Sequence, residues 1–328
     1  MVKQSILLTG ASGFIGRYVA RKLVSVPDFH VVCLLRDGAN HPQANSLTQD
    51  GAIVLPGNFY EALVIKEAFK QYRFQQVIHI AAIRGGGKAS AAEFREVNVN
   101  GTERLLCEAY EQQAQKFIFC SSVGVHGTIP EAVPAEIETP FNGDNQYHQS
   151  KIEAEEAVQR YIRKGLNAYI VRPTITYGVG DDGFPQTLVH LVRKRRLLLP
   201  RSNHQVHLVD VERLAEVFFK LVLNEQPAQR IFVAGDIEPI ALRDLANWIY
   251  RHRYQRPYPS YFRLPDWIFK LAFYLFQTIG NEKWAARAAL LSNDWHYQCA
   301  DTYRLLDIQP VPTREAFGRF LAVVETIS

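Results

Sequence analysis

Two residues whose types and spacing could do chemistry are Tyr147 and Lys151, four positions apart. The acidic, alanine-rich segment 152–158 that follows predicts a helix, so both side chains lie on one face. A phenol ordinarily loses its proton near pH ~10, and an ammonium beside it stabilises the phenolate and lowers that pKa. Tyr147 is therefore a candidate general acid/base near neutral pH, and Ser122, just past a predicted strand, is expected to hold the substrate oxygen. A Tyr-x-x-x-Lys pair alone is frequent by chance and usually forms helix surface, so its weight depends on the motifs that precede it.

A glycine-rich turn lies near the N-terminus, between a short apolar strand pattern and a helical one. Gly10 permits the tight turn, Gly13 lets the backbone approach a pyrophosphate, and Gly16 lets the helix pack close to the strand. Helix N–H groups then face the phosphates. Two residues separate each pair of glycines, which differs from the G-x-G-x-x-G form and is a weak signal alone. The turn predicts a dinucleotide site, with a ligand-free turn as the alternative.

The second apolar run, 30–35, ends at Arg36-Asp37, where a Rossmann fold places the residue that reads the adenosine ribose. A guanidinium suits a 2′-phosphate by charge and by bidentate hydrogen bonding. Asp37, one residue later, keeps NAD open. The pair favours NADP over NAD, and the alternative for Arg36 is a solvated loop cation.

Composition bounds the class of protein. The chain has 328 residues, 47% hydrophobic content and a net charge of +4, which gives no case for nucleic-acid binding. Its histidines and four cysteines have no metal-ligand spacing, so we expect no metal and reduced core thiols in a reducing compartment. A structural strand begins almost at once, and no apolar stretch reaches bilayer length, so we expect a cytoplasmic protein.

Strands and helices alternate along the first two-thirds of the chain, which predicts an α/β fold with a Rossmann-type doubly wound parallel sheet. We expect a nucleotide-binding domain from 1–172 plus about 206–234, and a smaller C-terminal substrate-binding domain from 173–205 and 235–328. The predicted strands are 5–9, 30–35, 52–55, 77–80, 116–121, 168–172 and 230–234.

The order of these motifs resembles that of the extended short-chain dehydrogenase/reductase superfamily, in its epimerase/dehydratase branch. The resemblance covers nearly the whole chain. Besides the glycine-rich turn and the Ser-Tyr-Lys set, it rests on the segments 57–58, 79–82, 98–102, 121–127, 172–174, 177–178 and 207–211.

This resemblance implies a role for each matching residue. Ser122, Tyr147 and Lys151 would be catalytic, and His207 and Asp210 would belong to a loop that supports the site. The residues implied to bind the cofactor are Gly10, Gly13, Phe14, Ile15, Gly16, Arg36, Asn58, Phe59, Ala81, Asn98, Lys151 and Pro173.

Departures from the family pattern bear on the reaction. Val123-Gly124 follow Ser122, where sugar 4,6-dehydratases have an Asp-Glu pair. Dehydration needs one group to remove a proton and another to protonate the departing hydroxyl, so a dehydratase is disfavoured. His126 stands where many nucleotide-sugar members have tyrosine, and Asn58 where an aspartate usually meets the adenine. The short segment between Pro173 and His207 favours a smaller or more apolar substrate than a nucleotide sugar.

We therefore expect an NADP-preferring oxidoreductase that moves hydride between nicotinamide and a carbonyl or secondary alcohol of a small, apolar, sterol- or flavonoid-type substrate. The alternative is a nucleotide-sugar 4-epimerase or 4-ketoreductase. A third hypothesis, a catalytically silent dinucleotide-sensing protein, is disfavoured because Ser122, Tyr147 and Lys151 are all present.

Two further expectations concern partners. The aromatic segment 266–276 predicts a helix that is either a lid over the pocket or a surface that touches membrane or a lipid-like substrate. A homodimer would form through the helices predicted at 89–114 and 148–164. The alternative is a monomer.

Overall fold

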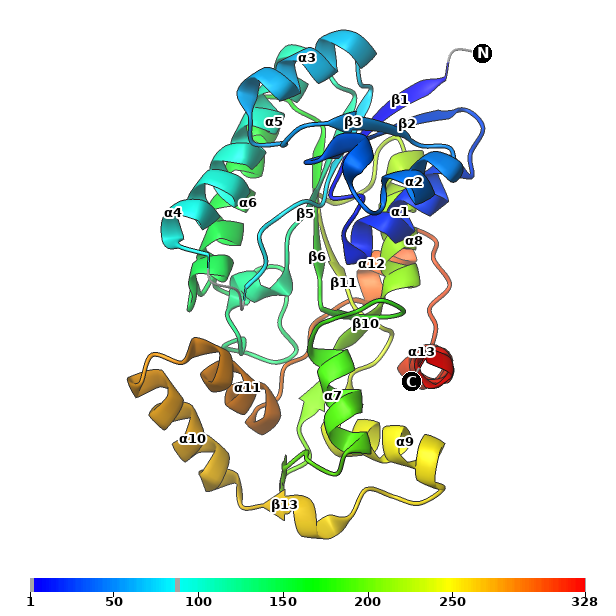
Figure 1. Ribbon diagram of the computed structural model, residues 1–328. Helices are drawn as coiled ribbons and strands as arrows, with labels where there is room; N and C mark the ends of the chain where they lie inside the picture. Colours follow the sequence, from blue (N-terminus) through cyan, green and yellow to red (C-terminus); the bar gives the residue numbers. More distant parts are fainter. Residues whose placement is uncertain (1–2, 86–88, 328) are drawn as a thin grey trace.

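The computed structural model describes residues 3–85 and 89–327. Within them, one sheet of seven parallel strands has the order β11-β6-β5-β4-β1-β2-β3 (Figure 1). These strands are β1 (Gln4–Thr9), β2 (Phe29–Leu35), β3 (Ile53–Pro56), β4 (Gln76–His79), β5 (Lys116–Cys120), β6 (Ala168–Pro173) and β11 (Ile231–Ala234). Each lies within one residue of its predicted bounds, so the predicted doubly wound parallel sheet is confirmed.

Helices cover both faces of the sheet, as an all-parallel sheet requires. One face carries α1 (Phe14–Val24), α2 (Ala44–Gln49) and α8 (Val211–Leu223), and the other carries α3 (Ala62–Tyr72), α5 (Gly101–Glu111) and α6 (Gln146–Arg163) (Figure 1). Successive residues of β1 divide between these layers: Ile6 and Leu8 pack with the first set of helices, and Leu7 packs with the second.

The strand order reverses at β1, which pairs with β2 on one side and β4 on the other. In such sheets, ligands bind outside the carboxyl ends of the strands at this switch point. The loops that carry the predicted site follow the carboxyl ends of β1, β4, β5 and β6. The fold therefore gathers them at one edge.

The remaining elements lie mostly beyond that edge. They include α7 (Phe184–Arg193), α9 (Leu242–Tyr254), α10 (Asp266–Thr278) and α11 (Glu282–Ser292), together with three short strand pairs. These pairs are β7 (Ile175–Tyr177) with β10 (Leu208–Asp210), β8 (Leu199–Pro200) with β13 (Arg263–Leu264), and β9 (Gln205–Val206) with β12 (Ile240–Ala241).

The chain then returns to the sheet through α12 (Ala300–Leu305), before its last helix, α13 (Thr313–Ile327). The Thr302 hydroxyl of α12 donates a 2.7 Å hydrogen bond to the carbonyl of Val233 in β11. Across the described residues, no helix has both the length and the apolar character needed to cross a bilayer.

Candidate active site

The glycine-rich turn joins β1 to α1 and has almost no room for side chains. A Cβ on Gly10, where φ is +80°, would lie 2.6 Å from the backbone nitrogen of Ala81, and one on Gly16 would lie 2.0 Å from the carbonyl oxygen of Gly10. Helix α1 begins at Phe14, and its N-cap residue Gly13 offers no side chain to the first N–H groups. This backbone cradle at a helix N-terminus fits the pyrophosphate of a dinucleotide. Ile15 and Phe14, also predicted to bind the cofactor, are half-buried.

Arg36 and Asp37, the residues predicted to read the ribose, follow the end of β2 and are exposed. The amide of Asn58, after β3, is hydrogen-bonded to Glu61. Phe59 turns inward, with its ring centroid 4.9 Å from that of His79. Its ring therefore packs against a residue at the end of β4.

A buried hydrogen-bond network links β1, β4 and α5. The Nδ1 atom of His79 is 2.7 Å from the Thr9 hydroxyl, and its Nε2 atom is 2.9 Å from the Thr102 hydroxyl, which donates to the carbonyl of Asn98. Because Thr102 donates its proton there, it accepts from Nε2–H of His79. Burial, assisted by Lys151, holds the pKa of His79 well below its ordinary value, so the ring is neutral.

Asn98, which the resemblance implies binds the cofactor, is hydrogen-bonded to two neighbouring loops. It lies in the π-turn η2 (Arg95–Asn100), and its amide pairs with the backbone of Ile83 at 2.8 and 2.9 Å. Its nitrogen also donates to the Ser150 hydroxyl, which donates to the carbonyl of Tyr147. Asn98 thus ties the loop after β4 to the first turn of α6.

Ser122, Tyr147 and Lys151 come together as the sequence predicts. Ser122 caps the short helix η3 (Val123–His126), and its hydroxyl hydrogen-bonds the Tyr147 side chain. The Nζ atom of Lys151 is buried and donates a 2.8 Å hydrogen bond to the carbonyl of Cys120, at the end of β5. The three side chains therefore lie at one strand end.

The electrostatics of Tyr147 differ from the expectation. Burial, with a contribution from Cys120, raises its pKa, whereas the Ser122 hydrogen bond and Arg84 act in the opposite direction. Lys151 does not provide the expected lowering because its ammonium is directed at the Cys120 carbonyl, and burial lowers its own pKa. The protein alone therefore holds Tyr147 as a neutral hydroxyl at neutral pH.

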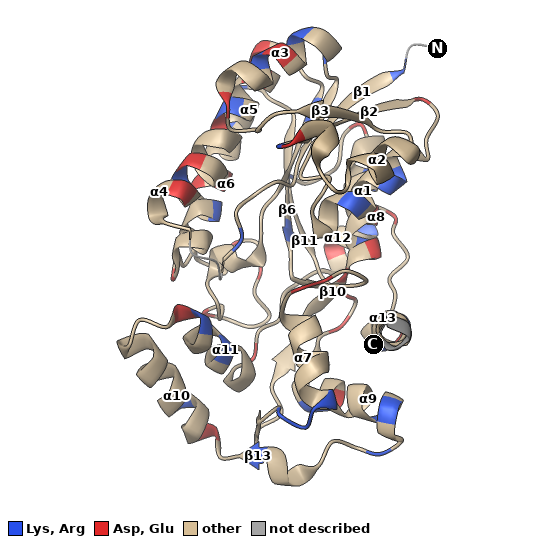
Figure 2. Cartoon of the chain, in the orientation of Figure 1, with Lys and Arg blue, Asp and Glu red and all other residues tan. Residues whose placement is uncertain are grey.

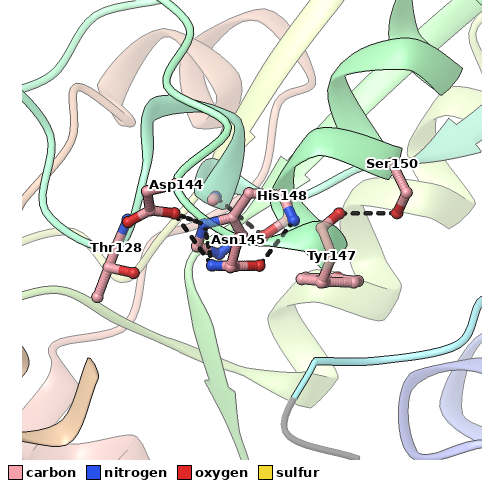
Figure 3. Close-up of polar contacts among 8 residues, drawn as sticks. Thr128, Asp144, Asn145, Tyr147, His148 and Ser150 are labelled. Carbon is pink, nitrogen blue, oxygen red and sulfur yellow. Dashed lines mark hydrogen bonds and ion pairs between the residues drawn. The ribbon is translucent and has the colours of Figure 1, made fainter. Parts of the chain in front are cut away.

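His148 lies beside Tyr147 and has polar partners that the sequence analysis did not identify. Asp144 and the N-cap residue Asn145 hold its Nδ1 atom at 2.5 and 2.7 Å (Figure 3). Its ring lies 5.7 Å from that of Tyr147, and its far edge faces Gly124, two residues from Ser122. The i, i+4 spacing of Asp144 and His148 was the available signal.

A fully buried ion pair joins α6, the helix that carries Tyr147 and Lys151, to β6. Arg172 donates to both oxygens of Glu155 at 2.7–3.2 Å. Its Nη1 atom also donates to the carbonyl of Ile137 and lies 3.2 Å from Nε2 of His126. This guanidinium therefore fixes the loop that follows Ser122.

The loop that contains His207 and Asp210, which the resemblance implies supports the site, is held by buried hydrogen bonds. The Nε2 atom of His207 donates to the carbonyl of Asp236, and its Nδ1 atom accepts from the backbone of Tyr297; burial lowers its pKa to about 4. Asp236, which the sequence analysis did not single out, accepts from the Tyr177 hydroxyl and from the backbone N–H of Asp210. Burial raises the pKa of Asp236 to about 7.

Two buried hydroxyls beside the site, those of Ser121 and Thr174, lack hydrogen-bond partners among the described residues. Thr174 follows Pro173, the last residue of β6. Groups of this kind fit a ligand that carries polar atoms. Among residues 3–85 and 89–327, no three His, Cys, Asp or Glu side chains are grouped as metal ligands.

Comparison with known proteins agrees with this geometry. Residues 6–235 match the model of the NAD dependent epimerase/dehydratase family, and the chain belongs to that family. A UDP-glucose 4-epimerase of Vibrio cholerae is 27% identical, over 82% of this chain and 81% of the relative. A 4-hydroxy-2-methyl-3-oxo-4-farnesyl-3,4-dihydroquinoline-1-oxide ketoreductase of Stigmatella aurantiaca is 26% identical, over 72% and 69%. The Bordetella bronchiseptica enzyme WbmH, solved in complex with NAD+, shares the fold with a TM-score of 0.76 at 15% identity, over 99% of this chain and all of its own.

These findings define an NAD-dependent enzyme of the oxidoreductase and epimerase type. Two conclusions from the sequence, the family and the Rossmann fold, are confirmed.

Proposed function

We propose that this protein is an NADP-preferring carbonyl reductase that acts on an apolar substrate. The observation that carries the proposal is the pairing of the Ser122 hydroxyl with a Tyr147 side chain that stays protonated. Two hydroxyl donors side by side suit a carbonyl oxygen. NADPH, when bound, would supply the hydride for the carbonyl carbon and leave as NADP+. Tyr147 donates its proton to the oxygen, which yields a secondary alcohol, and Ser122 orients that oxygen.

We assign cofactor binding to the turn from Gly10 to Gly16, to Arg36 at the adenosine end and to Lys151 and Pro173 at the nicotinamide end. Exposed Arg36 supports the NADP preference, because a guanidinium binds a 2′-phosphate as a charge-assisted pair. We assign substrate binding to 173–205 and 235–328. The ketoreductase relative, whose named substrate carries a farnesyl group, supports an apolar substrate.

The test combines cofactor titration with nucleotide identification. We expect exchangeable binding, tighter for NADPH than for NADH, and a loss of about tenfold or more in NADPH affinity in Arg36→Ala. The reciprocal variant Asp37→Ala should leave NADPH binding unchanged. Tyr147→Phe should lower the rate of NADPH oxidation by a factor of about 10² to 10⁴ and leave NADPH binding intact. Equal affinities for the two cofactors would overturn the NADP preference.

A nucleotide-sugar 4-epimerase or 4-ketoreductase is the second candidate, and the Vibrio cholerae relative favours it. Tightly held NAD that survives purification, with UDP-sugar interconversion and no net consumption of added cofactor, would select the epimerase. Sustained NADPH consumption with an apolar ketone would exclude it.

A further inference from the structure

Helix α10 presents an apolar face to solvent. Trp267, Leu271, Tyr274 and Leu275 recur at helical spacing along it, and their exposed fractions are 63%, 49%, 62% and 55%. The opposite face is apolar as well, and Phe269 on it is buried. A helix that is apolar all round normally lies in a protein core or in lipid, yet this one is covered on one side only.

The apolar surface continues around the end of the hairpin that α10 forms with α11. Ile279, in the turn, is 70% exposed, and Trp284, in α11, is 48% exposed. We call the six residues the hairpin patch: Trp267, Leu271, Tyr274, Leu275, Ile279 and Trp284. With side chains of about 150–250 Å² each, the patch exposes on the order of 600 Å², at the upper end of what a monomer leaves uncovered. The hairpin lies at the periphery of the molecule, away from the sheet (Figure 1).

Basic side chains lie in and next to the hairpin. From β13 to the middle of α11, segment 263–287 contains four Lys or Arg and two Asp or Glu, so it carries a net +2. Figure 2 shows α10 nearly free of charged residues, with a basic residue on the neighbouring β13. Lys270 lies within the exposed face of α10, and Lys283 is exposed next to Trp284.

We propose that the α10–α11 hairpin docks on the surface of an anionic lipid bilayer. Elements that lie in the membrane interface combine tryptophan, tyrosine and leucine with nearby lysine and arginine, as this hairpin does. At 13 residues, α10 is too short to span a bilayer and suits a position in its plane. The inference stands independently of the reaction proposed above.

The hairpin is connected to the loop that follows the catalytic serine. Just after α11, the carbonyl of His296 accepts from the backbone of Ala135, and the backbone N–H of Gln298 donates to the Ala135 carbonyl. Ala135 lies in the same loop as Ile137, which Arg172 holds. Docking of the hairpin would therefore bring the loop that follows Ser122 toward the bilayer, where an apolar substrate partitions.

The experiment is cosedimentation of the full chain with vesicles of phosphatidylcholine alone, or mixed with phosphatidylglycerol. We expect binding to the mixed vesicles that is weakened by salt, with little binding to the neutral ones. Fluorescence should shift to the blue on binding, since Trp267 and Trp284 are exposed while Trp295 is already buried. W267E/Y274E should weaken binding by about tenfold or more and leave cofactor binding unchanged. Leu63→Glu, on α3 and 79% exposed, is the matched control and should bind like the wild type.

Three results would overturn the proposal. The first is no binding to the mixed vesicles at low salt, and the second is equal binding by W267E/Y274E and the wild type. The third is a wild-type dimer that W267E/Y274E converts to a monomer, since the patch would then join two copies of the chain. Failure of NADPH oxidation in an otherwise vesicle-binding protein would contradict the proposed reaction alone.

Discussion

The buried ion pair between Glu155 and Arg172 is expected to control both stability and the shape of the site. Their side chains are 0% and 1% exposed, so each charge depends on the other for compensation. Glu155→Ala would leave a buried guanidinium without its carboxylate, at a cost of about 3–5 kcal/mol. For a chain of this size we expect the melting temperature to fall by roughly 4–7 °C.

The assay is urea unfolding followed by circular dichroism, on the single variants Glu155→Ala and Arg172→Met and on the double variant R172M/E155L. Because the double variant replaces the pair with apolar groups of similar size, it should be more stable than either single variant. The control is Glu103→Ala, whose pair with Arg160 is about half exposed, and its cost should stay within about 0.5 kcal/mol.

The same variants also report on catalysis. Arg172 holds the Ile137 carbonyl, so its loss should loosen the loop after Ser122 and lower kcat at temperatures where the fold is intact. A cost below about 1 kcal/mol for Glu155→Ala, or a double variant as unstable as the sum of the single ones, would refute the reasoning.

Three other predictions test separate parts of the structure. A Cβ in Gly124→Ala would lie 2.4 Å from the His148 ring, so kcat should fall by about tenfold or more with cofactor binding unchanged in titration; full activity would exclude a role for that ring position. Burial raises the pKa of Asp236 to about 7, so the contribution of this residue to stability is lost as pH rises from about 4 to 7. In urea unfolding, Asp236→Asn should therefore be more stable than the wild type at pH 8 but not at pH 4. Parallel pH profiles of the two proteins would contradict this. Gly16→Ala should abolish cofactor binding and lower the free energy of unfolding by at least about 2 kcal/mol, whereas the control Gly318→Ala, in α13 with open space around it, should match or slightly exceed wild-type stability.

The sheet and the grouping of Ser122, Tyr147 and Lys151 could be predicted from the sequence because their signals are local. Apolar runs bounded by turns define the seven central strands, and the helix that starts at Gln146 follows from the pattern around Tyr147. The two-residue strands β8 and β13 could not be predicted, because their pairing depends on contacts between segments more than 60 residues apart.

Side-chain direction was the main limit within the site. The sequence placed His148 beside Tyr147, but only the tertiary position of Asp144 and Gly124 determines where its ring points. Asp236 could not be found from its neighbours, since its partners Tyr177 and Asp210 come from β7 and β10.

The protonation of Tyr147 connects the fold with the direction of the proposed reaction. A reductase needs a proton donor at this position, and burial against Cys120 supplies one without any further adjustment. The removal of a proton from an alcohol, with which an epimerase begins, needs a phenolate, so positive charge must be brought near the ring. Lys151 is held by the Cys120 carbonyl, and Arg84 is paired with Asp182 at 3.0 Å. This arrangement supports the proposed reduction, in which Tyr147 donates its proton.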